Sequence, residues 1–199
     1  MLAGLALALG LALALAAEPP DCAPLVPATL DAESISRILG KWIYLIGSSK
    51  YPPHIEELKT VKYATFFFYP GSHEDELNVT EIMRVNETCV TRNTSKIHIF
   101  WNNSTLMHAD GPVVSVAELI QSDKDLLILK HFNTGFLGLS LSVRSHNVSK
   151  EHLEEFRAQL ACHGFTDDEI FPVSEKEACP VPGEQPGDDG EAAPEPQLA

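Results

Sequence analysis

Four cysteines are the side chains in this chain most able to do covalent chemistry. They are Cys22, Cys89, Cys162 and Cys179, and none lies in a Cys-x-x-Cys pair or at the spacing of zinc ligands. A catalytic thiol would require one cysteine to stay free, whereas an even number in an oxidising compartment is expected to pair. Four cysteines allow three pairings, and their spacing alone does not choose among them.

Eight histidines could in principle bind a metal or act as general bases. His98, His108, His131 and His146 lie within or beside the predicted strands, without the spacing of metal ligands. The sequence has no nucleophile elbow, paired-carboxylate motif or phosphate-binding loop. We therefore expect no metal, no cofactor and no catalytic residue, so the protein is not predicted to be an enzyme.

N-glycosylation sequons are dense. Average composition predicts roughly one or two in a chain of this length. Here the N-x-[ST] pattern occurs at Asn78, Asn86, Asn93, Asn102, Asn103 and Asn147. Asn102 and Asn103 overlap, so we expect only one of them to carry a glycan. The pattern predicts a secreted, heavily glycosylated protein in which each occupied site faces solvent.

The chain is acidic, with 199 residues and a formal net charge of -14. This charge argues against binding to nucleic acid or to anionic membranes, both of which require a basic surface. The acidity is concentrated near the end, because the chain from Asp167 onward holds 10 acidic residues and one basic residue. The remaining charge is close to balanced, so it indicates little about a partner.

Three segments differ in composition. Residues 1–17 are almost entirely Leu, Ala and Gly, which predicts a signal peptide cleaved after Ala16 or Ala17; an uncleaved anchor is the alternative. Residues 18–179 form the predicted domain. Residues 180–199 are acidic and rich in Pro and Gly, which predicts a disordered tail.

The central segment has the periodicity of β-strands. We predict eight strands, at 40–49, 61–69, 77–85, 89–101, 106–108, 113–121, 125–132 and 136–143. The sixth of these segments, 113–121, could instead be helical, because it contains the good helix formers Ala117, Glu118 and Leu119. Short connections and regular spacing favour a mainly β fold, an eight-stranded antiparallel up-and-down barrel or a sandwich.

Helical periodicity follows the strands. Ser149 is a suitable N-cap, and Leu153, Phe156 and Leu160 form one apolar stripe, which predicts an amphipathic α-helix over 149–162 that packs on the barrel wall. A short helical turn is also expected at 34–39, before the first strand.

Strand alternation predicts which side chains face the barrel interior. A glycan on Asn78 must point outward, so Val79, Glu81 and Met83 point inward. The same test fails for the next strand, where an outward Asn93 would turn the later apolar residues outward too. Either the strand contains a bulge there, or Asn93 precedes its regular part.

Several of these segments together resemble the lipocalin family, in particular its secreted plasma members. The resemblance starts with Gly40-Lys41-Trp42-x-Tyr44 and continues through ATFFFYP (64–70), DLLILKHF (125–132), GLSLSV (138–143) and KEHLEEFRAQLAC (150–162). It covers about Cys22 to Cys179. It implies an eight-stranded calyx closed at one end, with disulfides Cys22–Cys162 and Cys89–Cys179. It also implies that Trp42 plugs the closed end, and Arg144 is the candidate to stack on it.

The resemblance further implies reversible transport of lipophilic, often basic, molecules such as drugs and steroids by a secreted, monomeric, acute-phase plasma protein. Glu81 matches a family pocket acid that could pair with a cationic amine; the alternative is an exposed or rim carboxylate. Two positions depart from the family pattern: Ser142 stands where a Tyr is usual, and His108 where an Arg is usual. The implied ligand-binding residues are Tyr44, Phe67, Val79, Glu81, His108, Phe132, Ser140 and Ser142.

Two other functions stay open on the sequence alone. The glycans could be ligands for lectins or immune receptors, in which case the barrel would be only a scaffold. A free thiol at Cys89 would instead allow an isomerase of the kind the lipocalin fold also supports.

Overall fold

A computed structural model describes residues 22–110, 113–146 and 148–181. The predicted signal peptide and nearly all of the predicted tail lie outside these residues. Within them, no helix has the length and apolar character needed to cross a membrane.

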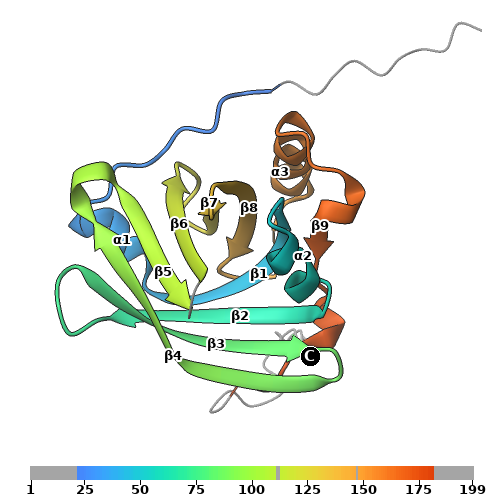
Figure 1. The fold of residues 1–199 in the computed structure, drawn as a ribbon, viewed down its shortest axis with the longest axis horizontal. Helices are drawn as coiled ribbons and strands as arrows, with labels where there is room; N and C mark the ends of the chain where they lie inside the picture. The colour runs from blue at the N-terminus through green and yellow to red at the C-terminus, as the bar shows by residue number, and fades with distance from the viewer. Residues whose placement is uncertain (1–21, 111–112, 147, 182–199) are drawn as a thin grey trace, which may run out of the picture.

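The fold is a closed antiparallel β-barrel (Figure 1). Its eight strands follow one another around the barrel in chain order, and β1 pairs with both β2 and β8, which closes it. This confirms the predicted up-and-down barrel. The strands are β1 (Gly40–Ser49), β2 (Val61–Pro70), β3 (Glu76–Val85), β4 (Thr88–Phe100), β5 (Thr105–Asp110), β6 (Val113–Ile120), β7 (Leu126–Asn133) and β8 (Phe136–Val143).

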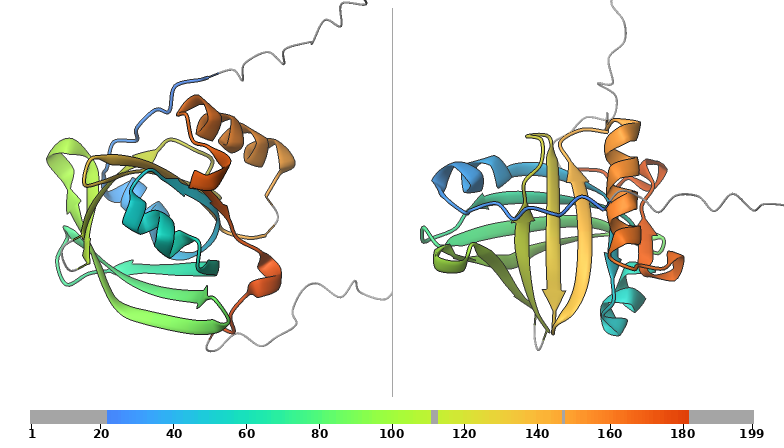
Figure 2. Two further views of the ribbon diagram at one scale, coloured as in Figure 1. Left: turned by 45° about the vertical axis from the view of Figure 1, so that its right-hand side comes forward. Right: turned by 90° about the horizontal axis from the view of Figure 1, so that it is seen from above.

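Within the described residues three α-helices accompany the barrel, and the views in Figure 2 show that they lie on different sides of it. α1 (Ala32–Ile38) begins at a capping box, in which Asp31 and Ser34 each accept a hydrogen bond from the other's backbone N–H. α2 (Pro52–Leu58), which we did not predict, lies between β1 and β2. α3 (Lys150–Cys162) begins at the predicted N-cap Ser149.

The α3 helix covers one side of the barrel, as its apolar stripe predicts. Phe156 and Leu160 are buried in a cluster with Ile46, Leu139 and Leu141 of β1 and β8. After α3, the short strand β9 (Ile170–Pro172) adds to the edge of β1. The part of the chain that the structure describes also has three 3₁₀ turns, η1 (Trp101–Asn103), η2 (Asp167–Glu169) and η3 (Glu175–Glu177).

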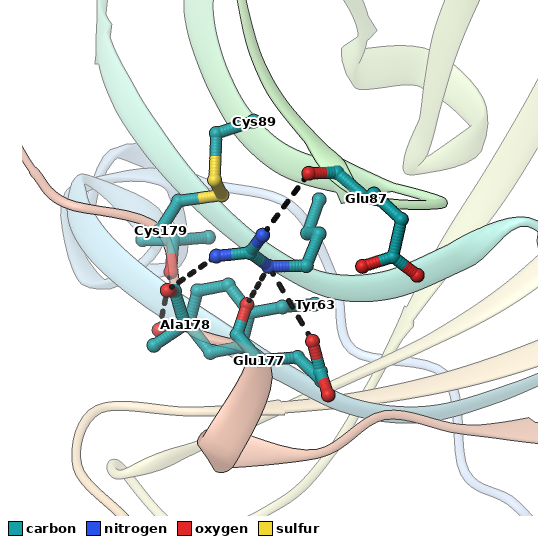
Figure 3. Close-up of a disulfide and its surroundings, with 8 residues drawn as sticks. Tyr63, Glu87, Cys89, Glu177, Ala178 and Cys179 are labelled. Atoms are coloured by element: carbon teal, nitrogen blue, oxygen red, sulfur yellow. Dashed lines mark hydrogen bonds and ion pairs between the residues drawn. A yellow bond between two sulfur atoms is a disulfide. The ribbon is translucent and has the colours of Figure 1, made fainter.

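Two disulfides fasten the chain ends to this framework. Cys22 is bonded to Cys162 at the end of α3, and Cys89 of β4 is bonded to Cys179. Figure 3 shows the second disulfide beside Glu177 and Ala178. Arg84 of β3 holds the same segment, because its guanidinium donates to the carbonyls of Glu177 (2.7 Å) and Ala178 (3.3 Å). The structure thus has the pairing that the lipocalin resemblance implies.

Trp42 lies at the closed end of the barrel. Its side chain is 2% exposed, and its indole N–H donates to the carbonyl of Ile38. The guanidinium of Arg144 stacks on the ring at 3.8 Å from the centroid. Arg144 also donates to the carbonyls of Arg37, Leu39 and Lys41, so it joins α1 to the start of β1. The stacking partner proposed from the sequence is therefore confirmed.

A bulge in β4 resolves the uncertain register at Asn93. Val79 of β3 pairs with Ser95, and Glu81 pairs with Arg92, so two residues of β4 stand opposite Thr80 alone. This is the geometry of a β-bulge. It allows Asn93 to be exposed while the residues that follow return to inward alternation.

Candidate ligand-binding site

The barrel encloses a cavity of about 530 Å³. Residues of all eight barrel strands line it, and α2 contributes residues at one end. A cavity of this kind, with an apolar lining and a few convergent polar groups, is the usual form of a small-molecule site. The lining has three chemically different parts: an apolar wall, a neutral polar wall and a charged rim.

The apolar wall is formed by β2, β3 and β4. Its main residues are Phe66, Phe68, Val79, Met83 and Ile97. Phe66 also meets Tyr44 edge-to-face, with ring centroids 6.3 Å apart and an interplanar angle of 87°. This wall offers a lipophilic molecule a continuous apolar surface, whose burial stabilises a complex by about 25 cal/mol per Å².

The neutral polar wall is formed by β1, β7 and β8, and we define it as Tyr44, His131, Ser140 and Ser142. Tyr44 and Ser142 are register partners on neighbouring strands. His131 Nε2 and the Ser140 hydroxyl share a hydrogen bond of 2.8 Å. All four side chains line the cavity, and none is charged at neutral pH.

Gly47 explains how Tyr44 reaches along this wall. A Cβ on Gly47 would collide with the phenol oxygen of Tyr44, so the hydroxyl lies directly over the glycine. Gly47 is in turn the register partner of Ser140. The Tyr44 hydroxyl is therefore brought toward Ser140, and through it toward His131.

The charged rim contains two carboxylates and one guanidinium. Glu57 of α2 lies 3.7 Å from Arg92 of β4, and Glu81 is the register partner of Arg92. All three line the cavity. Glu81 is thus not an isolated charge in the cavity, because Arg92 and Glu57 share its surroundings.

Burial changes the proton affinity of the cavity groups. Desolvation, with a smaller contribution from the neighbouring His54, lowers the pKa of His131 to about 4. Burial also lowers the pKa of His54, which Glu57 partly opposes. Desolvation raises the pKa of Tyr44 well above its ordinary value. At neutral pH the two imidazoles and the phenol are therefore uncharged.

Six of the eight residues that we expected to bind ligand line the cavity: Tyr44, Val79, Glu81, His108, Ser140 and Ser142. Phe67 and Phe132 do not line it, which corrects the sequence-based assignment. Each belongs to a strand whose flanking residues point inward, Phe66 and Phe68 in β2 and His131 in β7, so alternation turns it outward. Outside the barrel, the ring of Phe132 lies 5.3 Å from the Lys130 ammonium.

The remaining predicted sites are distributed over the surface. Asn86, Asn93, Asn102 and Asn103 are exposed, Asn78 is half-buried, and Asn147 lies outside the described residues. The part of the chain that the structure describes contains no free cysteine and no cluster of three or more potential metal ligands. Cys89 is bonded to Cys179, so the thiol that an isomerase would need is not free.

An eight-stranded antiparallel calyx, closed by a tryptophan with a stacked arginine and covered by a C-terminal helix, defines the lipocalin class of barrels. The chain belongs to the ApoM-domain family, whose model matches residues 8–182. It is 30% identical to alpha-1-acid glycoprotein of Bos taurus, over 82% of this chain and 83% of that protein. It is 27% identical to alpha-1-acid glycoprotein of Oryctolagus cuniculus, over 77% of this chain and 78% of that protein. The resemblance found in the sequence is confirmed.

Solved structures support the same fold. Siderocalin Q83 has a TM-score of 0.58 at 21% identity and covers 76% of this chain and 98% of its own. The odorant-binding protein OBP1 has a TM-score of 0.58 at 13% identity, with coverages of 72% and 95%. At these identities the likeness shows the fold alone.

Proposed function

We propose that this protein is a secreted carrier that reversibly binds lipophilic small molecules, neutral or basic, in the barrel cavity. Drugs and steroids are the ligand classes in question. The observation that carries the proposal is the cavity of about 530 Å³ with one apolar wall and few polar groups. The odorant-binding protein and the siderocalins among the structural neighbours are named as binding proteins, which supports a binding role for this barrel.

Secretion is supported by the two disulfides, because such bonds form and persist in oxidising compartments. The exposed sequons agree with this location. The barrel leaves no unpaired edge within its eight strands, which suits a monomer. A role as an acute-phase plasma protein is part of the same proposal, and it is supported only by the similarity to the alpha-1-acid glycoproteins.

Glu81 is the residue proposed to select basic ligands. It lines the cavity beside the apolar wall, where a carboxylate can pair with an amine more strongly than in water. Arg92 competes with such an amine for Glu81, so the preference for cations should be moderate rather than absolute. Glu81→Gln is expected to weaken basic ligands selectively. An equal loss of affinity for neutral steroids would assign Glu81 a structural role instead.

Tryptophan fluorescence provides the direct test of the carrier function. Trp42 packs in the same buried cluster as Phe68 and Val79, which line the cavity, whereas Trp101 is 39% exposed on η1. In a Trp101→Phe variant, a lipophilic ligand should change the remaining signal and saturate at one molecule per chain. If no lipophile of any charge class saturates, the carrier function is rejected.

A second candidate function is glycan-dependent binding to lectins or immune receptors. The observation that favours it is the exposure of Asn86, Asn93, Asn102 and Asn103 on the described surface. Enzymatic deglycosylation distinguishes the two functions, because pocket binding should survive the treatment whereas lectin binding should not.

A further inference from the structure

Two hydroxyl groups of the neutral polar wall have no protein partner among the described residues. The phenol of Tyr44 and the hydroxyl of Ser142 line the cavity, yet neither takes part in a hydrogen bond within that part of the chain. Neither hydroxyl oxygen is among the fully enclosed, unpartnered side-chain atoms of the described residues, so each keeps some accessible surface, and it faces the cavity. A ligand group that hydrogen-bonds to one of them gains about 0.5–1.5 kcal/mol for each net hydrogen bond.

His131 adds to the same wall a third atom that is available for a hydrogen bond. Its Nε2 is taken by Ser140, and the other ring nitrogen has no hydrogen-bond partner in the described structure. The half-buried imidazole lines the cavity, so its remaining accessible surface faces the cavity. A neutral imidazole has one donor and one acceptor nitrogen, and Ser140 can accept from or donate to Nε2. The free nitrogen can therefore serve either a donor or an acceptor.

We propose that Tyr44, Ser142 and the His131–Ser140 pair form a subsite for the hydroxyl group of an uncharged amphipathic alcohol, whose hydrocarbon body packs on the apolar wall. The proposal rests on the carrier function, since it names a ligand class for the same cavity. An alcohol both donates and accepts, so it matches phenol, hydroxyl and imidazole together. An ammonium or a carboxylate would meet no opposite charge on this wall, because Glu57, Glu81 and Arg92 all come from α2, β3 and β4.

The acidic and basic neighbours do not change this assignment. His54 of α2 faces the same region, but its Nδ1 shares a 3.1 Å hydrogen bond with Asn133. Burial lowers the pKa of both His54 and His131, so both imidazoles are neutral at pH 7. The wall therefore presents neutral donors and acceptors to a ligand over the physiological pH range.

Three ten-carbon probes that differ only at one end test the proposal: 1-decanol, decane and 1-decylamine. Each probe displaces the neutral dye Nile red from the glycosylated full-length protein, and dissociation constants are measured at pH 7.4. The wild-type protein should bind decanol about 10-fold more tightly than decane, which corresponds to one or two net hydrogen bonds. Tyr44→Phe and His131→Leu should each reduce this ratio about threefold or more, because decanol loses a hydrogen bond that decane never makes.

Tyr63→Phe is the matched control, because the Tyr63 phenol is buried, accepts a 2.9 Å hydrogen bond from Thr65 and lies outside the cavity. This variant should lose thermal stability but keep the decanol-to-decane ratio. A wild-type ratio near one, or equal losses for decane and decanol in Tyr44→Phe, would overturn the proposal. So would a decylamine affinity that depends on Tyr44 when that of decanol does not. If neither Nile red nor any probe binds the wild-type protein, the carrier function itself fails.

Discussion

Acidification should destabilise the fold through His131, because its imidazole is held neutral inside the barrel. Its pKa is lowered to about 4 in the folded chain by desolvation and by the nearby His54, against about 6.5 in an unfolded chain. A histidine whose pKa is lower in the folded state binds its proton more readily when unfolded. The stabilisation is therefore complete above about pH 6.5 and is lost as pH falls toward 4.

The expected magnitude follows from the difference in pKa. One pKa unit corresponds to about 1.4 kcal/mol, so the free energy of unfolding should fall by on the order of 3 kcal/mol between pH 7 and pH 4 because of this group. Urea unfolding of the wild type and of His131→Gln at one-unit pH intervals measures it. The glutamine variant keeps a polar side chain but does not titrate. The difference between the unfolding free energies of the two proteins therefore isolates the contribution of His131 from those of the carboxylates and the other histidines.

The difference between the two unfolding free energies should shrink steadily as the pH falls from 6.5 to 4. A difference that stays constant across this range would mean that His131 is protonated equally in both states, and the cavity would then be wet and polar rather than desolvated. In His54→Gln the total loss should be slightly smaller and should end at a slightly higher pH, since desolvation and the repulsion from His54 together lower the folded-state pKa of His131 and the variant removes the second of them.

Three further perturbations test the closed end, the second disulfide and the cavity wall. Arg144→Met removes the stacking on Trp42 and three hydrogen bonds to carbonyls. The free energy of unfolding should fall by about 3 kcal/mol, and Arg144→Lys should give an intermediate loss. An unchanged melting temperature would contradict a stabilising role for Arg144 at the closed end. Replacing Cys89 and Cys179 together by Ser should cost about 2–5 kcal/mol in urea unfolding, and no loss would show that the bond is not structural. Phe66→Ser should weaken Nile red binding about 10-fold, whereas Phe67→Ser, on the opposite face, should not; equal losses would contradict the assigned facing.

The barrel itself was predictable because its strands alternate in polarity or are bounded by turn residues. The strands 40–49 and 136–143 are observed at their predicted bounds, and the helix after Ser149 begins at its predicted cap. Two elements were missed because they are too short to show a period: the seven-residue α2, which starts at Pro52, and the three-residue β9. Both depend on contacts with β1 rather than on a pattern of their own.

The cavity lining was harder to predict than the fold, because in two strands the inward and outward residues do not differ in polarity in the way that burial would predict. Three phenylalanines in succession occupy 66–68, so nothing local shows that the middle one points outward. In β7 the inward position holds His131 and the outward one Phe132, the reverse of what hydrophobicity predicts. Only the register with the neighbouring strands decides these orientations, which are β1 and β3 for β2 and β6 and β8 for β7.

Two local irregularities determine which polar groups reach the cavity. In β1 the register shifts between Tyr44 and Ile46, and this is why Tyr44 and Gly47 both line the cavity although they are three positions apart, an offset that regular alternation would place on opposite faces. In β4 a second bulge, opposite Thr80, brings Arg92 inside together with residues further along the strand. A regular alternation would have placed Ile46 over the cavity and left no glycine for the Tyr44 hydroxyl to lie on. The apolar period thus specifies a barrel that many sequences share, whereas the two bulges determine which polar side chains line this cavity.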